Sequence, residues 1–109
     1  TLKKICEAAG SYKREKGAIL CGINMEGPFI AMERKGAQNG DFVHKPDAEM
    51  FRRLNKASGG MVKLLAIAPE VDGAKECIEA LKDEVVLSVA HTTADYEEAS
   101  EAFEMVFIM

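Results

Sequence analysis

The sequence has no apolar run that approaches the ~20 residues of a membrane-spanning helix, and its start shows no signal-peptide pattern. It also lacks a Walker loop, the glycine fingerprint of dinucleotide-binding proteins and the nucleophile elbow of α/β-hydrolases. These absences argue against a membrane-spanning protein and against three large classes of α/β enzyme.

An excess of positive charge is missing too, because 18 acidic residues outnumber 14 basic ones and the net charge is −4. Phosphate backbones and anionic lipids repel such a chain, so we expect no nucleic acid and no membrane as partner. Cysteine is scarce, and Cys6, Cys21 and Cys77 are far apart, each within an apolar pattern. This spacing fits neither a disulfide framework nor a metal knuckle. It predicts three buried thiols in a reducing compartment, which we take to be the cytoplasm.

The 109 residues that are present are 48% apolar and 29% charged, which is typical of one globular unit with a modest core. Helical and strand patterns alternate along them, and the chain begins at Thr1 rather than at methionine. The predicted helices span residues 2–16, 46–58, 72–81 and 93–104, and the predicted strands span residues 18–24, 62–67 and 85–89, with a fourth strand opening at 106–109. Such alternation implies right-handed βαβ crossovers and a parallel sheet. We predict an α/β fold of three to four consecutive βα units, a single segment over residues 1–109 of a (β/α)8 TIM barrel in a longer protein.

Details of the later elements can also be predicted. Asp72 is expected to cap the third helix, and Thr92, with Asp95 three residues on, is expected to start the fourth. Tyr96, Ala99 and Phe103 are predicted to form the apolar face of that last helix. The polar stretch over residues 31–45 is a long loop, and such loops often carry binding function.

Three side chains that can carry chemistry follow the three predicted strands. Glu26 precedes the strand-ending pair Gly27-Pro28, Glu70 follows the second strand, and His91 follows the third. The carboxyl ends of parallel strands meet at one edge of a sheet, so we expect these side chains to cluster. A carboxylate and an imidazole are a partial ligand set for a divalent metal such as zinc. A catalytic site needs at least one further protein ligand and an open position for water.

Each of these residues also has a purely structural interpretation. Glu26 would pair locally, and His91 would be a satisfied polar residue beside a helix start. Glu70 would be stabilised by the dipole of the helix whose first turn it occupies. His44 is expected to be a surface histidine. The residues alone leave these alternatives open.

Four segments carry a resemblance to a known family. Residues 22–30 (GINMEGPFI), 35–39 (KGAQN), 68–70 (APE) and 90–92 (AHT) resemble, in order and spacing, the N-acetylglucosamine-6-phosphate deacetylases of the amidohydrolase superfamily. The resemblance runs from about residue 17 to 104. It implies a metal site in a (β/α)8 barrel and metal-dependent hydrolysis of the acetamide of N-acetylglucosamine 6-phosphate, giving glucosamine 6-phosphate and acetate.

The resemblance also implies residue roles. Glu26 is similar to the family's metal-binding glutamate, and His91 to the first of its two metal-binding histidines. Ala37 and Gln38 fall where the family contacts the sugar, although many members have histidine at the position of Gln38. An amide can hydrogen-bond there but cannot shuttle protons. The implied cofactor is a divalent metal, zinc first, with iron, manganese or cobalt as alternatives. The implied partner is a phosphorylated amino sugar, and the full-length enzyme is expected to be a homodimer.

The chain departs from the family after residue 104. There the family continues into a Thr-His-Leu-Phe-Asn-Ala-Met segment with the second histidine and the phosphate contacts, and later supplies the catalytic aspartate. Neither has a counterpart in residues 105–109, nor does the family's small β-domain, so we place no catalytic residue in this chain. Two ligands hold a metal weakly or not at all, so we expect no turnover by the 109-residue chain alone.

Two other functions remain open from the sequence. The first is a self-contained small α/β domain that binds a ligand or partner without catalysis, which predicts covered strand edges. The second is an amidohydrolase with a different amide or ring substrate, since a fold and its metal ligands do not fix the substrate.

Overall fold

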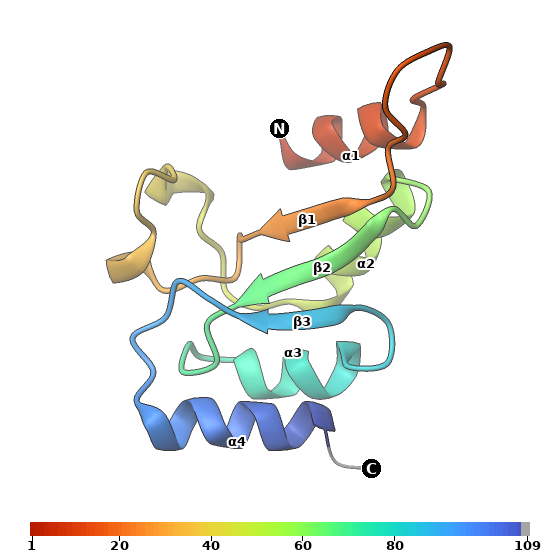
Figure 1. Cartoon of the computed structure of the whole chain (residues 1–109). Helices are drawn as coiled ribbons and strands as arrows, with labels where there is room; N and C mark the ends of the chain where they lie inside the picture. The colour runs from red at the N-terminus through yellow and green to blue at the C-terminus, as the bar shows by residue number, and fades with distance from the viewer. Residues whose placement is uncertain (108–109) are drawn as a thin grey trace.

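The computed structural model describes residues 1–107, which form a three-stranded parallel sheet with four α-helices (Figure 1). The elements in chain order are α1 (Leu2–Gly10), β1 (Ile23–Glu26), the 3-10 turns η1 (Met32–Arg34) and η2 (Gly40–Phe42), α2 (Ala48–Ala57), β2 (Val62–Ile67), α3 (Ala74–Leu81), β3 (Val86–Val89) and α4 (Tyr96–Phe107). In the part of the chain described, no helix has both the length and the hydropathy to cross a bilayer.

The sheet has the strand order β1-β2-β3, and both pairings are parallel. Glu26 pairs with Ala66, and Ala66 pairs with Ser88, so the three strands end at nearly the same level. This arrangement of consecutive βα units confirms the predicted α/β fold with a parallel sheet.

The helices pack against one face of the sheet. Met25, Leu65 and Leu87 are register partners, and all three belong to the core or pack against it. Side chains alternate between the faces of a strand, so the neighbouring positions point to the opposite face. Each helix contributes to the same core: the helix residues buried in it are Cys6, Phe51, Leu54, Ala74, Cys77, Ile78, Leu81 and Ala102.

The first helix and first strand differ from the sequence prediction. The helix ends at Gly10 rather than near residue 16, and a Cβ at Gly10 would lie 2.9 Å from the backbone oxygen of Ala57, so the helix ends where the backbone meets α2. The strand begins at Ile23 rather than near residue 18, because the partner strand β2 begins at Val62, which pairs with Ile23. The apolar run over residues 18–21 is exposed.

The prediction of three buried thiols was also wrong for one of them. Cys6 and Cys77 are buried, whereas Cys21 is exposed because it belongs to that unpaired run. None of the three forms a disulfide.

The start of α3 and the course of α4 also differ from the prediction. Gly73, not Asp72, is the N-cap of α3. The backbone N–H of Glu98 donates to Asp95 Oδ1 (2.9 Å) and that of Asp95 donates to Glu98 Oε2 (3.0 Å), so α4 has a capping box one turn later than expected.

The buried face of α4 also lies at other positions than predicted. Tyr96 and Phe103 are exposed, while Ala102 is buried and Met105 packs against the core. The predicted fourth strand is wrong where it can be compared, because residues 106 and 107 continue α4; residues 108–109 lie outside the described part of the chain.

Candidate functional site

Glu26 is the last residue of β1 and stands at the rim because the chain turns sharply behind it. Gly27 has φ +96°, a conformation that favours glycine, and Phe29 is fully buried. The backbone N–H of Ala68 donates to Phe29 O (2.9 Å), and that of His44 donates to Pro28 O (2.9 Å). This buried segment is thus tied to the end of β2 and to the long loop, and it holds the Glu26 carboxylate in position.

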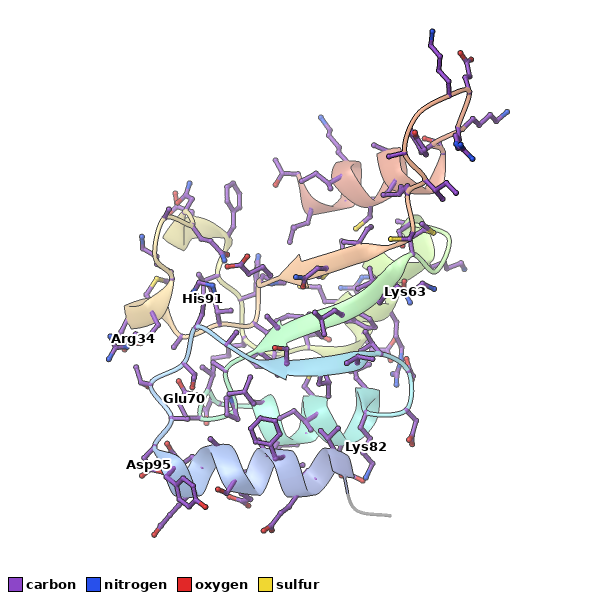
Figure 2. The ribbon with its side chains drawn as sticks, viewed as in Figure 1. Arg34, Lys63, Glu70, Lys82, His91 and Asp95 are labelled. Carbon is purple, nitrogen blue, oxygen red and sulfur yellow. The ribbon has the colours of Figure 1, made fainter. Side chains whose placement is uncertain are left out.

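His91 follows β3 across the sheet from Glu26. Its backbone has φ +49°, which non-glycine residues rarely adopt, and its carbonyl accepts a hydrogen bond from Ala31 N (2.9 Å). The ring lies between two acceptors: Nδ1 is 2.7 Å from Arg34 O, and Nε2 contacts Glu26 Oε1. Figure 2 shows His91 and Arg34 together beyond the ends of the strands, at the edge toward which the strand arrows point.

The acceptor at Nδ1 decides how the imidazole is protonated. A carbonyl oxygen only accepts, so Nδ1 carries a proton and donates it to Arg34 O. Nε2 then faces a carboxylate, and the contact holds a proton between them. The hydrogen bond to the Arg34 carbonyl, followed by the one to Glu26, raises the pKa of His91 above its usual value. The side chains of Glu26 and His91 are 59% and 27% exposed, so the pair is open to solvent.

This pair fits part of a metal site. A ligating histidine normally donates its second ring N–H to a carbonyl or carboxylate, which leaves the other nitrogen free for the metal. His91 shows that arrangement, and a cation can replace the proton shared with Glu26. Among residues 1–107 no group of three or more His, Cys, Asp and Glu side chains is placed to hold a metal, so the pair supplies two donors.

Glu70 lies beside this pair rather than in it. It precedes α3 by four residues, so the interpretation that it occupies the first turn of that helix was wrong. Its carboxylate accepts hydrogen bonds from Thr92 Oγ1 (2.5 Å), Thr93 N (2.7 Å) and Thr93 Oγ1 (3.0 Å). We expected Glu70 to cluster with His91, but its hydrogen bonds reach Thr92 and Thr93, the two residues after His91, and not His91 itself. Sequence reasoning missed the two threonines as its partners, although their position after His91 was a usable signal.

The two predicted sugar contacts lie in the long loop. Lys35 organises this part, because its ammonium donates to Gln38 O (3.1 Å) and its carbonyl accepts from Gln38 N (3.1 Å). Gln38 lines a cavity of about 310 Å³ together with Glu26, Gly27 and Phe42. This volume is at the lower end of the ~300–1,000 Å³ of small-molecule pockets. Ala37, the residue before Gln38, is exposed. His44, as expected, is exposed.

Comparisons with known proteins bear on this geometry. No protein-family model matches the chain. The N-acetylglucosamine-6-phosphate deacetylase of Bacillus subtilis (strain 168) is 41% identical over 87 residues, which is 79% of this chain and 22% of that protein. The enzyme of the same name from Lysinibacillus sphaericus is 31% identical over 96 residues, which is 87% of this chain and 24% of that protein.

A solved structure agrees with these relatives. It is a mutant N-acetyl-D-glucosamine-6-phosphate deacetylase from Mycobacterium smegmatis in complex with N-acetyl-D-glucosamine-6-phosphate. It aligns with a TM-score of 0.84 at 33% identity, over 95% of this chain and 27% of that one. The chain thus spans between 22% and 27% of the length of these proteins. The resemblance predicted from the four sequence segments is confirmed, as is the α/β fold.

Proposed function

We propose that this chain is a segment of a metal-dependent N-acetylglucosamine-6-phosphate deacetylase, a hydrolase that acts on a linear amide and releases acetate and glucosamine 6-phosphate. The observation that carries the proposal is the contact between the Glu26 carboxylate and the His91 imidazole at the carboxyl edge of the sheet. The relatives that bear this enzyme name match 79% and 87% of this chain.

Glu26 and His91 are the residues that would hold the metal. A bound divalent cation polarises an amide carbonyl and lowers the pKa of a bound water. We propose zinc, because carboxylate and imidazole donors suit it, with iron, manganese or cobalt as alternatives. Because Nδ1–H is held by Arg34 O, loss of the proton that Nε2 shares with Glu26 would leave the Nε2 lone pair available to the metal. Two donors bind a metal weakly, so the remaining ligand and the acid–base group belong to other parts of the longer enzyme.

Gln38 and Ala37 are the proposed substrate contacts, and the substrate is a phosphorylated amino sugar. Support comes from the cavity that Gln38 shares with Glu26, which lets one ligand reach both. The Gln38 amide offers a donor and an acceptor to sugar hydroxyl or amide groups. Its backbone is fixed by Lys35, so the contact is pre-organised.

We further propose that the longer enzyme is a cytoplasmic homodimer. The three unpaired thiols support the compartment, since reducing conditions keep cysteines free. The dimer rests on the family resemblance, and sedimentation of the longer protein tests it.

The decisive experiment uses the protein translated from the complete reading frame that encodes this chain. Glu26→Gln and His91→Gln are expected to lower acetate release from N-acetylglucosamine 6-phosphate by at least ~100-fold, because each removes a metal donor. His44→Gln, which removes the other histidine at an exposed position, is the matched control and is expected to keep wild-type activity. Full activity in either site variant would refute the proposal. The 109-residue chain by itself is expected to release no acetate, and metal-dependent release by it would contradict its assignment as a segment.

The two alternatives can be separated from this proposal. A self-contained binding domain would cover its strand edges, yet among the described residues β1 and β3 each pair along one side only, and Val86 of β3 is 65% exposed. Another amidohydrolase substrate is tested by offering the longer protein other N-acetyl sugars. Faster turnover of one of them would replace the proposed substrate.

A further inference from the structure

We propose that Glu70 is a positioning residue: it fixes residues 92–93 so that the His91 ring stays between Arg34 O and Glu26. The placement of the ring is a property of the metal-free chain. The consequence for metal binding rests on the function proposed above.

The first support is the set of contacts that Glu70 makes. Each of its oxygens accepts from a different threonine: Oε2 from Thr92 Oγ1 (2.5 Å) and Oε1 from both Thr93 N (2.7 Å) and Thr93 Oγ1 (3.0 Å). Thr92 Oγ1 in turn accepts from Ala94 N (2.9 Å). The carboxylate is therefore joined to two side chains and a backbone amide directly after His91. Hydrogen bonds to an ionised carboxylate are about twice as strong as neutral ones.

The second support is the backbone of His91 itself. A φ of +49° is unfavourable for a residue with a Cβ, so neighbouring contacts must hold it. On one side Ala31 N donates to His91 O. On the other side the Glu70 contacts hold the next two residues. If these were lost, residues 91–93 would relax toward an ordinary conformation, and the ring would leave both acceptors.

The third support is that Glu70 is mounted on a fixed part of the fold. It follows Ala68 and Pro69, which are buried at the end of β2, and Val71 N donates back to Ala68 O (3.3 Å). Figure 2 places Glu70 between the end of the sheet and the start of α4, on the path of the chain that leads from His91 to Asp95. Because Glu70 is fixed at the end of β2, its hydrogen bonds hold the residues that follow β3 at a fixed place relative to β2.

The carboxylate is also in the required charge state. Burial alone would raise the pKa of Glu70, but the hydrogen bonds from Thr92 and Thr93 outweigh it and lower the pKa below its usual value. Glu70 is consequently an ionised acceptor at neutral pH.

The test uses the 109-residue chain without metal and follows the ring ¹⁵N signals by NMR. The chain has two histidines, so the exposed His44 is an internal reference in every spectrum. In the wild type at mildly acidic pH, where the imidazole is protonated, His91 is expected to show both ring N–H groups and proximity to Arg34 and Glu26, whereas the exposed His44 ring is expected to lack such contacts. Glu70→Ala is expected to remove these proximities. Glu70→Gln, which retains an acceptor for Thr93 N, is expected to restore the wild-type signals in part.

Glu97→Ala is the matched control, because it removes an exposed carboxylate from the first turn of α4, and it is expected to leave His91 unchanged. Thr92→Val removes one donor without removing the carboxylate, and it replaces Glu70→Ala if that variant does not fold. Wild-type His91 signals in folded Glu70→Ala or in Thr92→Val would overturn the proposal.

A titration with Zn²⁺ alone then separates this inference from the proposed function. In Glu70→Ala, the Zn²⁺ concentration that perturbs His91 is expected to rise by ~10-fold or more, as for other groups that orient a ligand. Absence of Zn²⁺ binding by the wild-type protein translated from the complete reading frame, which supplies the remaining ligands, would refute the metal site. The metal-free spectra would still decide whether Glu70 positions the ring.

Discussion

Single residues of one type behave differently here according to burial, and the cysteines show this most clearly. Burial, followed by the nearby Asp47, raises the pKa of Cys77 to about 11, and burial also raises that of Cys6. Cys21 is exposed. Because the thiolate is the reactive form, a disulfide reagent is expected to modify one thiol rapidly and the other two only on unfolding. Absorbance with Ellman's reagent measures this. Cys21→Ser should remove the fast phase, and two fast thiols in the native wild type would contradict it.

Gly27 is a second residue whose role follows from its surroundings. Its φ of +96° disfavours a side chain, and a Cβ there would lie 2.9 Å from Gln38 Oε1. Gly27→Ala is expected to lower the free energy of unfolding by roughly 1–3 kcal/mol, measured by urea denaturation. Gly36→Ala is the control, since Gly36 also has a positive φ but nothing lies within 4 Å of its Cβ position. An equal loss in both variants would show that contact with Gln38 has no effect.

At this scale the sequence predicted the main feature of the site and missed its supports. Glu26 and His91 are 65 positions apart, and the rule that parallel strands end at one edge was enough to bring them together. The acceptor for His91 Nδ1 is a backbone carbonyl, that of Arg34, which any residue type would supply. No sequence pattern reports such a group. The metal-binding role of Glu26 and His91 and the substrate-binding role of Ala37 and Gln38 stay predictions.

Helix ends belong to the element scale, and α4 offers a matched pair of tests with α3. Asp95 accepts from Glu98 N at the start of α4, whereas Asp72 lies one residue before the N-cap Gly73, which has no side chain to cap α3. Asp95→Ala is expected to cost about 0.5–2 kcal/mol in the free energy of unfolding, and Asp72→Ala close to nothing. Thermal and urea unfolding of both variants measure this. A larger loss for Asp72→Ala would reverse the assignment of the caps.

The elements that the sequence predicted well are those whose local signals agree with their tertiary environment. β2 has the predicted bounds, and α2 starts where the side chain of Asp47 accepts from Met50 N. β1 was misplaced because an apolar run becomes a strand only where a partner strand runs beside it. The cap of α4 was misplaced because the Thr92 hydroxyl is committed to Glu70. In both cases the decisive contact is distant in sequence.

The stability of the whole chain is expected to depend on pH through Glu70. Its pKa in the folded chain is below the ordinary value of 4.5, so its contribution is complete above that pH. It is lost as the pH falls through the lower folded pKa, where the native carboxylate takes up a proton. Glu70→Gln should therefore be less stable than the wild type at pH 7, and the difference should shrink toward pH 3. Urea unfolding across this range measures it, and a difference that does not change with pH would exclude Glu70 as the cause.

The two faces of the sheet differ in exposure, and this difference predicts how the chain packs within a longer protein. Leu65 is fully buried under the helices, while Val86 stands on the opposite face, 65% exposed, in register with Leu64. In the 109-residue chain, Leu65→Ala is expected to cost about 2–5 kcal/mol and Val86→Ala within ~0.5 kcal/mol. In the longer protein, further barrel strands would enclose the second face. The cost of Val86→Ala should then rise to roughly 1–3 kcal/mol, while that of Leu65→Ala stays similar. Urea unfolding of both variants in both lengths measures the change. An unchanged, negligible cost for Val86→Ala in the longer protein would mean that this face remains in solvent, which a closed barrel does not allow.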